Sequence, residues 1–395
     1  MCSIRALQPT CFKSPTYQHL NLYLAIAVTL VASGATLRAT KSVTVAELSA
    51  LVQRDISSNK TDDQIAGDLK DLELSQQLIT PAFNALIALK PGPRTVEQLS
   101  VQLYASVLKP LPEPPPVNRP TPDAAEQKSI TDKLASYITT SFSQVPSFTV
   151  NKTVMRFDNS SMSRQQDFRL AQGNGTNTPN TLNATVGLLT RYRGATTTPM
   201  QVIHGTESAV TGKAGLASDP LGPIFTEEFG ALLPLIAQQS TGNLQWQRWD
   251  LIDNIPVAVF AFAVDHKQTH YEVNYCCFAE YDIKGRRGVT PLLSDAEWKP
   301  FKKMEPYHGL LYVEPRTGSV LRLILQTDLK TSDNVTQEDT RVDYATVKLG
   351  DKSWILPKDQ FTQTRVVVSG TNSGHTYTEI RNIYAISYSG FRPHP

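Results

Sequence analysis

Cysteine is scarce in this sequence, with four among 395 residues. Cys2 and Cys11 precede an apolar N-terminal run, so only Cys276 and Cys277 remain for the rest of the chain. These neighbours lie in a predicted strand, where successive side chains point to opposite faces, and a bond between them would need a strained geometry. We therefore expect no disulfide framework. The pair is interpreted as two small buried hydrophobic residues, with a redox or metal pair as the alternative.

An excess of charge of one sign is also lacking. Charged residues make up 19% of the chain, and the formal net charge is +2. A nucleic-acid-binding surface would need a concentrated basic stripe. The nearest candidate, KGRR at residues 284–287, is typical of a solvated loop. We expect no nucleic-acid partner.

The common catalytic and cofactor motifs are missing. The sequence contains no Walker-type loop, no Rossmann glycine fingerprint and no zinc-binding cysteine set. His266 and His270 have the spacing of a helical metal site, but they fall in a predicted turn between strands. Residues 370–374 (GTNSG) are a hairpin turn, and the adjacent Glu227 and Glu228 would point apart on a helix. We therefore expect no catalytic residue, no metal and no cofactor, and interpret the protein as a non-enzyme.

The chain has a single long apolar run, at residues 20–35. As a helix it would span about 24 Å, which is less than the roughly 30 Å of a bilayer core. Arg5 and Lys13 precede the run, and the small residues 33–35 (SGA) end it, as in a signal peptide. We predict that residues 1–35 are a cleaved signal peptide, with an uncleaved anchor as the alternative. The mature chain then has no membrane-spanning segment and is exported to the periplasm or cell envelope.

Two segments of different composition follow the apolar run. Residues 43–109 carry apolar side chains at helical spacing, and Thr80 and Thr95 are predicted to be the N-cap residues of two of these helices. This helical module is interpreted as a packing unit, or as a docking site for a protein partner. Residues 110–122 hold seven prolines in thirteen positions, which predicts an extended linker of up to about 40 Å. We expect this linker to hold the module away from the rest of the chain.

Residues 123–395 are predicted to form a β-domain. A helix at 123–143 leads into about ten segments with strand periodicity, with a long interruption at 283–305 and an apolar helical insert at 224–239 that ends or kinks near Pro234. A continuous antiparallel sheet of this length must curl. The expected fold class is therefore α+β.

The hairpin at residues 307–326 is the clearest local signal. Apolar residues alternate with others on both sides of the break at 315–318 (PRTG), which predicts two antiparallel strands joined by a tight turn. One face of the second strand carries Leu321, Leu323 and Leu325. Such a strand belongs to a sheet with one dry face.

Several short segments of this β-domain follow one another in an order that is similar to that of a known protein family. They are VPSF at 145–148, FTEEFGALL at 225–233, LQWQRW at 244–249, YEVNY at 271–275, GLLYV at 309–313 with Thr317-Gly318, KLG at 348–350 and Leu356-Pro357. Together they resemble a family of uncharacterised exported bacterial proteins. The β-domain of that family is similar to the periplasmic lipoprotein carriers and other outer-membrane lipoprotein-sorting proteins.

The resemblance implies a strongly curved antiparallel sheet, an unclosed barrel, wrapped around helices. In the carriers the apolar concave face shelters lipid chains, so a lipid or lipidated protein is the expected partner. The alternative is a cell-envelope scaffold or protein-interaction protein whose concavity is filled by its own side chains. The resemblance implies no catalytic residues. The residues expected to contact the ligand are Phe225, Phe229, Leu233, Leu321, Leu323 and Leu325.

Overall fold

The computed structural model describes residues 41–112, 117–159, 190–210, 222–223, 232–239, 244–281, 296–369 and 377–394. The chain divides into the units Met1–Ala39 and Thr40–Pro395, and the fold below is that of the second unit. It combines helices with a large antiparallel sheet that is not closed, which confirms the expected mixed class. The predicted signal peptide lies outside the described residues.

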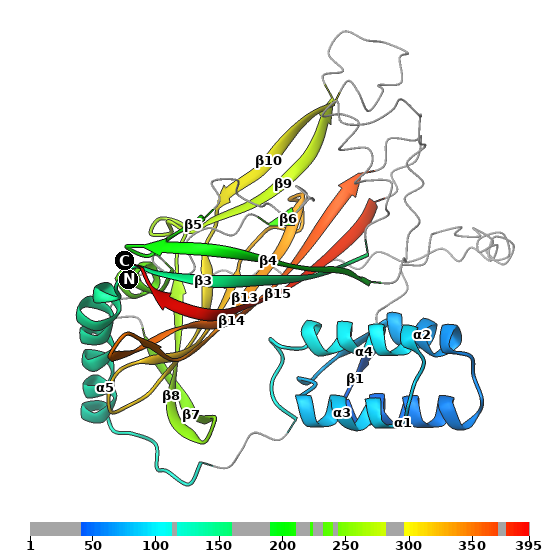
Figure 1. The fold of residues 1–395 in the computed structure, drawn as a ribbon, viewed down its shortest axis with the longest axis horizontal. Coiled ribbons are helices and arrows are strands. Elements are labelled where there is room, and N and C mark those ends of the chain that lie inside the picture. The colour runs from blue at the N-terminus through cyan, green and yellow to red at the C-terminus, as the bar shows by residue number, and fades with distance from the viewer. Residues whose placement is uncertain are drawn as a thin grey trace, which may run out of the picture. The chain divides into compact units, whose positions relative to one another are not determined.

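The module at 43–109 contains four helices and a pair of short parallel strands. Leu48, Leu69 and Leu99 are completely buried in its core, and Figure 1 shows α2 beside α4 and α1 beside α3. Helices are present where the apolar spacing predicted them, but the parallel strand pair was not expected. The elements are β1 (Lys41–Val43), α1 (Val45–Ser57), α2 (Asp62–Lys70), β2 (Leu72–Leu74), α3 (Thr80–Ala88) and α4 (Pro93–Ala105).

Neither Thr80 nor Thr95 caps a helix as the sequence predicts. The N-cap of α3 is Ile79, so Thr80 is already the first helical residue, and Thr95 lies inside α4. Helix α4 begins two residues earlier, at Pro93, where proline is favoured because the first turn needs no amide donor. The carboxylate of Asp62 accepts hydrogen bonds from the backbone amides of Arg94 and Thr95, both at 2.9 Å. A residue of α2 therefore caps α4, which ties the two helices together.

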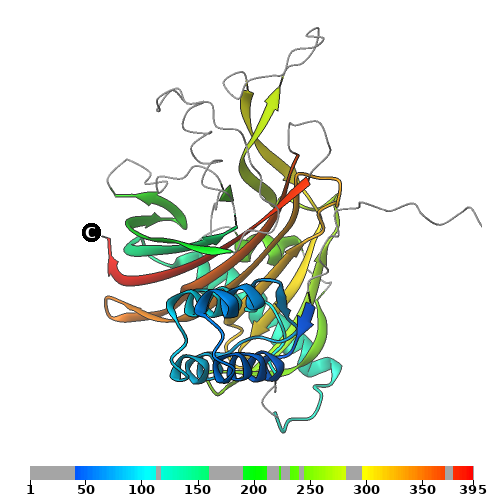
Figure 2. The ribbon, with the colours of Figure 1, turned by 90° about the vertical axis from the view of Figure 1, so that its right-hand side faces the viewer.

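The β-domain is built on a ten-stranded sheet. Its strands are β3 (Phe148–Asp158), β4 (Arg191–Ile203), β5 (Thr206–Ala209), β7 (Gln245–Ile252), β8 (Ile255–Val264), β11 (Tyr307–Val313), β12 (Val320–Thr327), β13 (Val335–Leu349), β14 (Lys352–Ser369) and β15 (Tyr377–Pro393). The spatial order is β5-β4-β3-β15-β14-β13-β12-β11-β8-β7, and every neighbouring pair is antiparallel. The end strands β5 and β7 do not pair with each other, so the sheet is open. Figure 2 shows the long strands β13–β15 twisting along their length.

A second sheet joins β9 (Glu272–Tyr281) to β10 (Ala296–Met304) and β6 (Gly222–Pro223). Figure 1 shows β9 and β10 as a neighbouring pair. Strand β10 lies inside the segment that we expected to interrupt the strands, so that expectation is wrong. Its sequence, AEWKPFKKM, is rich in Lys and contains Pro, a composition that natural edge strands use and that hides the strand from periodicity.

The hairpin of β11 and β12 is confirmed. Gly318 has a φ of 77° in its turn, a conformation that favours glycine. A Cβ atom at Gly318 would also collide with the backbone of Lys133 in helix α5 (Ala124–Ser136). The Lys133 ammonium donates to the Pro315 carbonyl at 3.2 Å. Glycine at this turn therefore permits close approach of α5.

The two faces of the ten-stranded sheet contact different parts of the chain. Val342 and Tyr344 of β13 lie on the face that packs against α5, against η1 (Tyr137–Ser141) and η2 (Phe142–Gln144), and against α7 (Leu232–Gln239). We call it the inner face. Arg341 and Asp343 alternate with these residues and lie on the opposite, outer face. The largest apolar cluster of the described residues is on the inner face.

The outer face contacts the helical module directly. Arg341 donates to the backbone carbonyl of Val107 at 2.9 Å, and the ring of Tyr104 lies 6.2 Å from that of Phe361. Burial alone would raise the pKa of Asp343. The guanidinium groups of Arg341 and Arg322 beside it nevertheless hold that pKa below its usual range. The expectation that the linker keeps the module away from the sheet is therefore wrong. That expectation assumed that a proline-rich segment always separates the two parts of the chain that it connects.

Candidate functional site

Three of the six predicted ligand-contacting residues come together on the inner face. Leu233 of α7 and Leu323 and Leu325 of β12 belong to one apolar cluster, with exposed fractions of 1%, 0% and 0%. The described part of helix α7 runs from Leu232 to Gln239, so the helix does not end at Pro234. The predicted partners Phe225 and Phe229 fall outside the described residues, as do Glu227 and Glu228.

Leu321 does not share this cluster. The pairing of β11 with β12 shifts register between Tyr312 and Val313, and Leu321 is the extra residue of the resulting bulge. Its side chain packs instead with Val257 and Val259 in a separate cluster. The predicted three-leucine face is therefore wrong at this position, because period-two alternation holds only within an unbroken register.

A cavity of about 240 Å³ lies beside this apolar cluster. A water molecule takes roughly 30 Å³ in the liquid, so the cavity has the volume of about eight water molecules. His204 and Gly205 turn the chain between β4 and β5 at its edge, with φ angles of 48° and 79°. The remaining lining residues are Ser143 and the apolar Phe142, Val145, Pro146, Phe148, Val202 and Pro234.

The cavity connects two apolar clusters and the short helix α7. Phe142 belongs to the inner-face cluster, whereas Phe148 and Val202 belong to a second cluster around β3 and β4. Pro234 lies in α7, whose Leu233 and Ile236 are buried in the inner-face cluster. Helix α7 therefore contributes both to a wall of the cavity and to the inner-face cluster.

Two tyrosines place hydroxyl groups within this apolar region. The hydroxyl of Tyr137, on η1, lies 3.5 Å from the backbone carbonyl of Ile355. Tyr344 has an exposed fraction of 6%, and its hydroxyl has no hydrogen-bond partner among the described residues. Burial raises the pKa of both tyrosines above the ordinary value, so both hydroxyls stay protonated.

At the far edge of the sheet, β7 holds part of the proline-rich segment. The indole Nε1 of Trp249 donates to the carbonyl of Pro120 at 2.7 Å. The guanidinium of Arg119 lies 3.8 Å from the centre of the same indole ring, a cation–π contact. Trp246 and Trp249 also pack against the inner-face cluster. The segment is thus attached to the strand at the end of the sheet.

The other half of the inner face carries a row of buried polar side chains, which we call the polar row. Strand β9 packs against it. The hydroxyl of Tyr275 accepts a hydrogen bond from Asn382 at 3.1 Å, and Asn382 also donates to Thr364 at 3.2 Å. The polar row consists of Glu338 and Thr340 on β13, Gln360, Thr362 and Thr364 on β14, and Asn382 on β15.

Glu338 is the titratable member of the polar row. Its carboxyl group accepts a hydrogen bond from the hydroxyl of Tyr271 at 3.0 Å and has an exposed fraction of 5%. Burial raises the pKa of Glu338 to about 7; the bond from Tyr271 opposes this and Asp339 adds to it. The group therefore changes charge near neutral pH.

Sequence reasoning missed the polar row. Its residues alternate with others along β13 and β14, and polar residues at every second position normally indicate a solvent-exposed face. The cover over this face comes from β9, which is not a neighbour of β13 or β14 in the main sheet. A polar pattern in three consecutive long strands was the only available signal.

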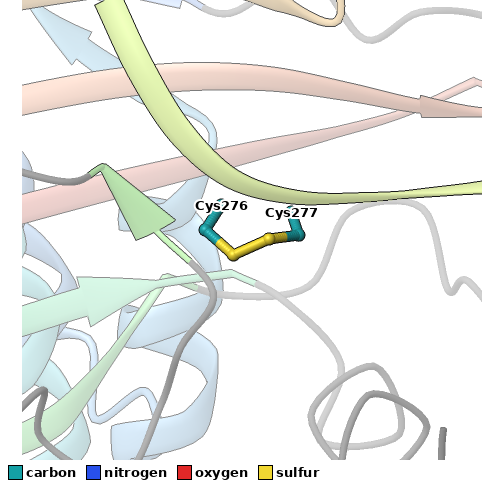
Figure 3. The surroundings of a disulfide bond; sticks show 2 residues. All are labelled: Cys276 and Cys277. Carbon is teal, nitrogen blue, oxygen red and sulfur yellow. A yellow bond between two sulfur atoms is a disulfide. The ribbon is translucent and has the colours of Figure 1, made fainter. Parts of the chain in front are cut away.

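The structure corrects the prediction for the two cysteines. Cys276 and Cys277 are joined by a disulfide on β9, as Figure 3 shows. The prediction assumed the alternation of a regular strand with trans peptide bonds, whereas the bond between these residues is cis. The pair packs beside Trp298.

The described residues contain no group of three or more His, Cys, Asp or Glu side chains arranged to hold a metal ion. His266 and His270 lie in the turn between β8 and β9, as the sequence predicted. His270 Nδ1 is 3.0 Å from the carbonyl of Gln268. Among the helices of the described ranges, none is both long and apolar enough to cross a membrane.

The chain matches no family model, and its comparison with curated proteins and with solved structures yields no significant match. The resemblance to the lipoprotein carriers stays a prediction from the sequence.

Proposed function

We propose that this is an exported, non-enzymatic protein that binds a lipid or a lipidated partner on the inner face of its open sheet. In this proposal the sheet curves around α5, η1 and α7 as an unclosed barrel. The acyl chain enters through the cavity beside α7 and extends among the leucines of the inner-face cluster.

The observation that carries the proposal is the cavity next to the short helix α7. Most of its lining residues are apolar, although polar atoms form as much of the exposed lining as apolar atoms do, and Pro234 of α7 forms one wall. Burial of each methylene contributes about 0.8 kcal/mol, so ten methylenes correspond to about 8 kcal/mol, a micromolar dissociation constant. If the ligand displaces α7, the free energy needed for that displacement weakens the binding.

One observation favours the alternative scaffold function. Leu233, Leu323 and Leu325 are already buried by other residues of the chain. A self-filled inner face needs no ligand for stability. In that case the contact surface of the protein would lie elsewhere, and the cavity would stay empty.

A fluorescent fatty acid, titrated at up to tens of micromolar, tests the binding proposal. Ser143 is exposed and borders the cavity, so Ser143→Trp fills the entrance without changing the buried clusters. We expect saturable binding by the wild type and at least a tenfold loss of affinity in Ser143→Trp.

Ser141→Trp is the matched control, because Ser141 is also exposed and does not border the cavity. It should bind the probe as the wild type does. Absence of uptake by the wild type would end the binding proposal in favour of the scaffold. Equal loss in both variants would show that the probe does not use this entrance.

Export is supported by the apolar run at 20–35, which follows two basic residues and ends in small residues as a signal peptide does. N-terminal sequencing of the protein from a cell-envelope fraction should give a start near Thr36. An intact N-terminus in the cytosolic fraction would contradict export.

A further inference from the structure

Tyr344 is unusual among the polar groups buried in the inner-face apolar cluster. The alternation of β13 places it beside Val342 and directs it toward η1 and α7. Its hydroxyl is buried and has no hydrogen-bond partner among the described residues. A buried hydroxyl without a partner loses its bonds to water and gains nothing in return. The apo protein therefore pays a stability cost at this position.

The neighbouring Tyr137 provides a direct comparison. It belongs to the same cluster, but its hydroxyl lies within reach of the Ile355 carbonyl. The ring of Tyr137 lies 6.3 Å from that of Phe142, the first residue of η2, which lines the cavity. Tyr344 does not line the cavity itself, but it belongs to the same apolar cluster as these two residues.

We propose that the hydroxyl of Tyr344 is the polar anchor of the ligand site, and that the ligand is an acyl compound whose carbonyl or carboxyl oxygen accepts its hydrogen bond. This inference rests on the proposed lipid-binding function and specifies the ligand class. A protonated tyrosine hydroxyl can donate one hydrogen bond and accept others, and a carbonyl or carboxyl oxygen accepts the bond that it donates. A pure hydrocarbon would leave the hydroxyl without a partner.

The test compares three probes of equal chain length: decanoic acid, its methyl ester and decane. Each displaces the fluorescent fatty acid from the wild type, from Tyr344→Phe and from Tyr137→Phe. One neutral hydrogen bond contributes about 1–1.5 kcal/mol, which corresponds to a roughly five- to tenfold change in affinity. We expect Tyr344→Phe to lose that factor for the acid and the ester, and to bind decane as the wild type does.

Thermal unfolding of the ligand-free proteins gives an independent readout. Tyr344→Phe removes an unpartnered hydroxyl and should raise Tm by about 2–4 °C. Tyr137→Phe should not raise Tm, and it should keep the preference for the acid and ester over decane.

The outcomes separate the two proposals. If the wild type binds none of the probes, both the lipid-binding function and this inference fail. If the wild type binds them and Tyr344→Phe keeps full affinity for the acid and ester, the function stands and the anchor is wrong. A lower Tm for ligand-free Tyr344→Phe would also overturn the anchor, because it would mean that the hydroxyl is already satisfied, for instance by a buried water.

Discussion

At the scale of single residues, Glu338 combines burial with a hydrogen bond from one side chain of the described residues, that of Tyr271. Its pKa of about 7 in the folded protein lies above the ordinary value of 4.5 for a glutamate carboxyl group. The folded state therefore keeps a proton that the unfolded state releases between these two values. The stabilising contribution is complete below about pH 4.5 and is lost as the pH rises to about 7.

This difference predicts a measurable pH dependence. Between pH 4.5 and 7, the free energy of unfolding of the wild type should fall by about 3 kcal/mol because of Glu338. Glu338→Gln keeps the size of the side chain and removes the titration, so its decrease over this range should be smaller by that amount. Urea unfolding at several pH values measures it.

Glu297→Gln is the control, because the Glu297 side chain is 74% exposed. It should follow the wild type. Parallel curves for wild type and Glu338→Gln would show that burial does not perturb Glu338 in the folded protein.

Residue identity also shows where sequence reasoning was limited. The helical spacing of 43–109 and the alternation of β3, β8, β11 and β12 predicted elements that the structure contains. The bulge at Leu321, the polar row and the bond between Cys276 and Cys277 depend on register and on distant strands. The residue pattern of one strand does not show which other element of the chain packs against that strand.

At the scale of elements, the proline-rich segment is attached to an edge strand. Trp249 of β7 holds Pro120 by a hydrogen bond and Arg119 by a cation–π contact. The unpaired edge of a sheet is a site of unwanted association, and this attachment covers one end of β7. The compositional prediction of a linker at 110–122 identified the segment but not its attachment.

Trp249→Ala should release this attachment. Without the indole, both contacts are lost, and the segment around Val117 becomes more accessible to a protease. We expect faster cleavage by elastase after Val117, measured by mass spectrometry of the fragments under native conditions.

Gln247→Ala provides the comparison on the same strand, because the Gln247 side chain is exposed and donates a hydrogen bond to the Gln245 carbonyl, not to the proline-rich residues that the structure describes. Its cleavage rate should equal that of the wild type. An unchanged rate in Trp249→Ala would show that other contacts hold the segment.

At the scale of the whole molecule, the described part of the chain is an open ten-stranded sheet with different partners on its two faces. The outer face contacts the helical module through Arg341, and the inner face contains the apolar cluster, the cavity and the polar row.

Native mass spectrometry of the protein purified from a cell-envelope fraction tests the central claim most directly. The account predicts an additional mass of one lipid on the wild type and on Ser141→Trp, and its loss in Ser143→Trp, whose tryptophan blocks the cavity. The bare mass of the polypeptide in all three proteins, at an instrument energy that preserves weak complexes, would contradict lipid binding and leave the scaffold function.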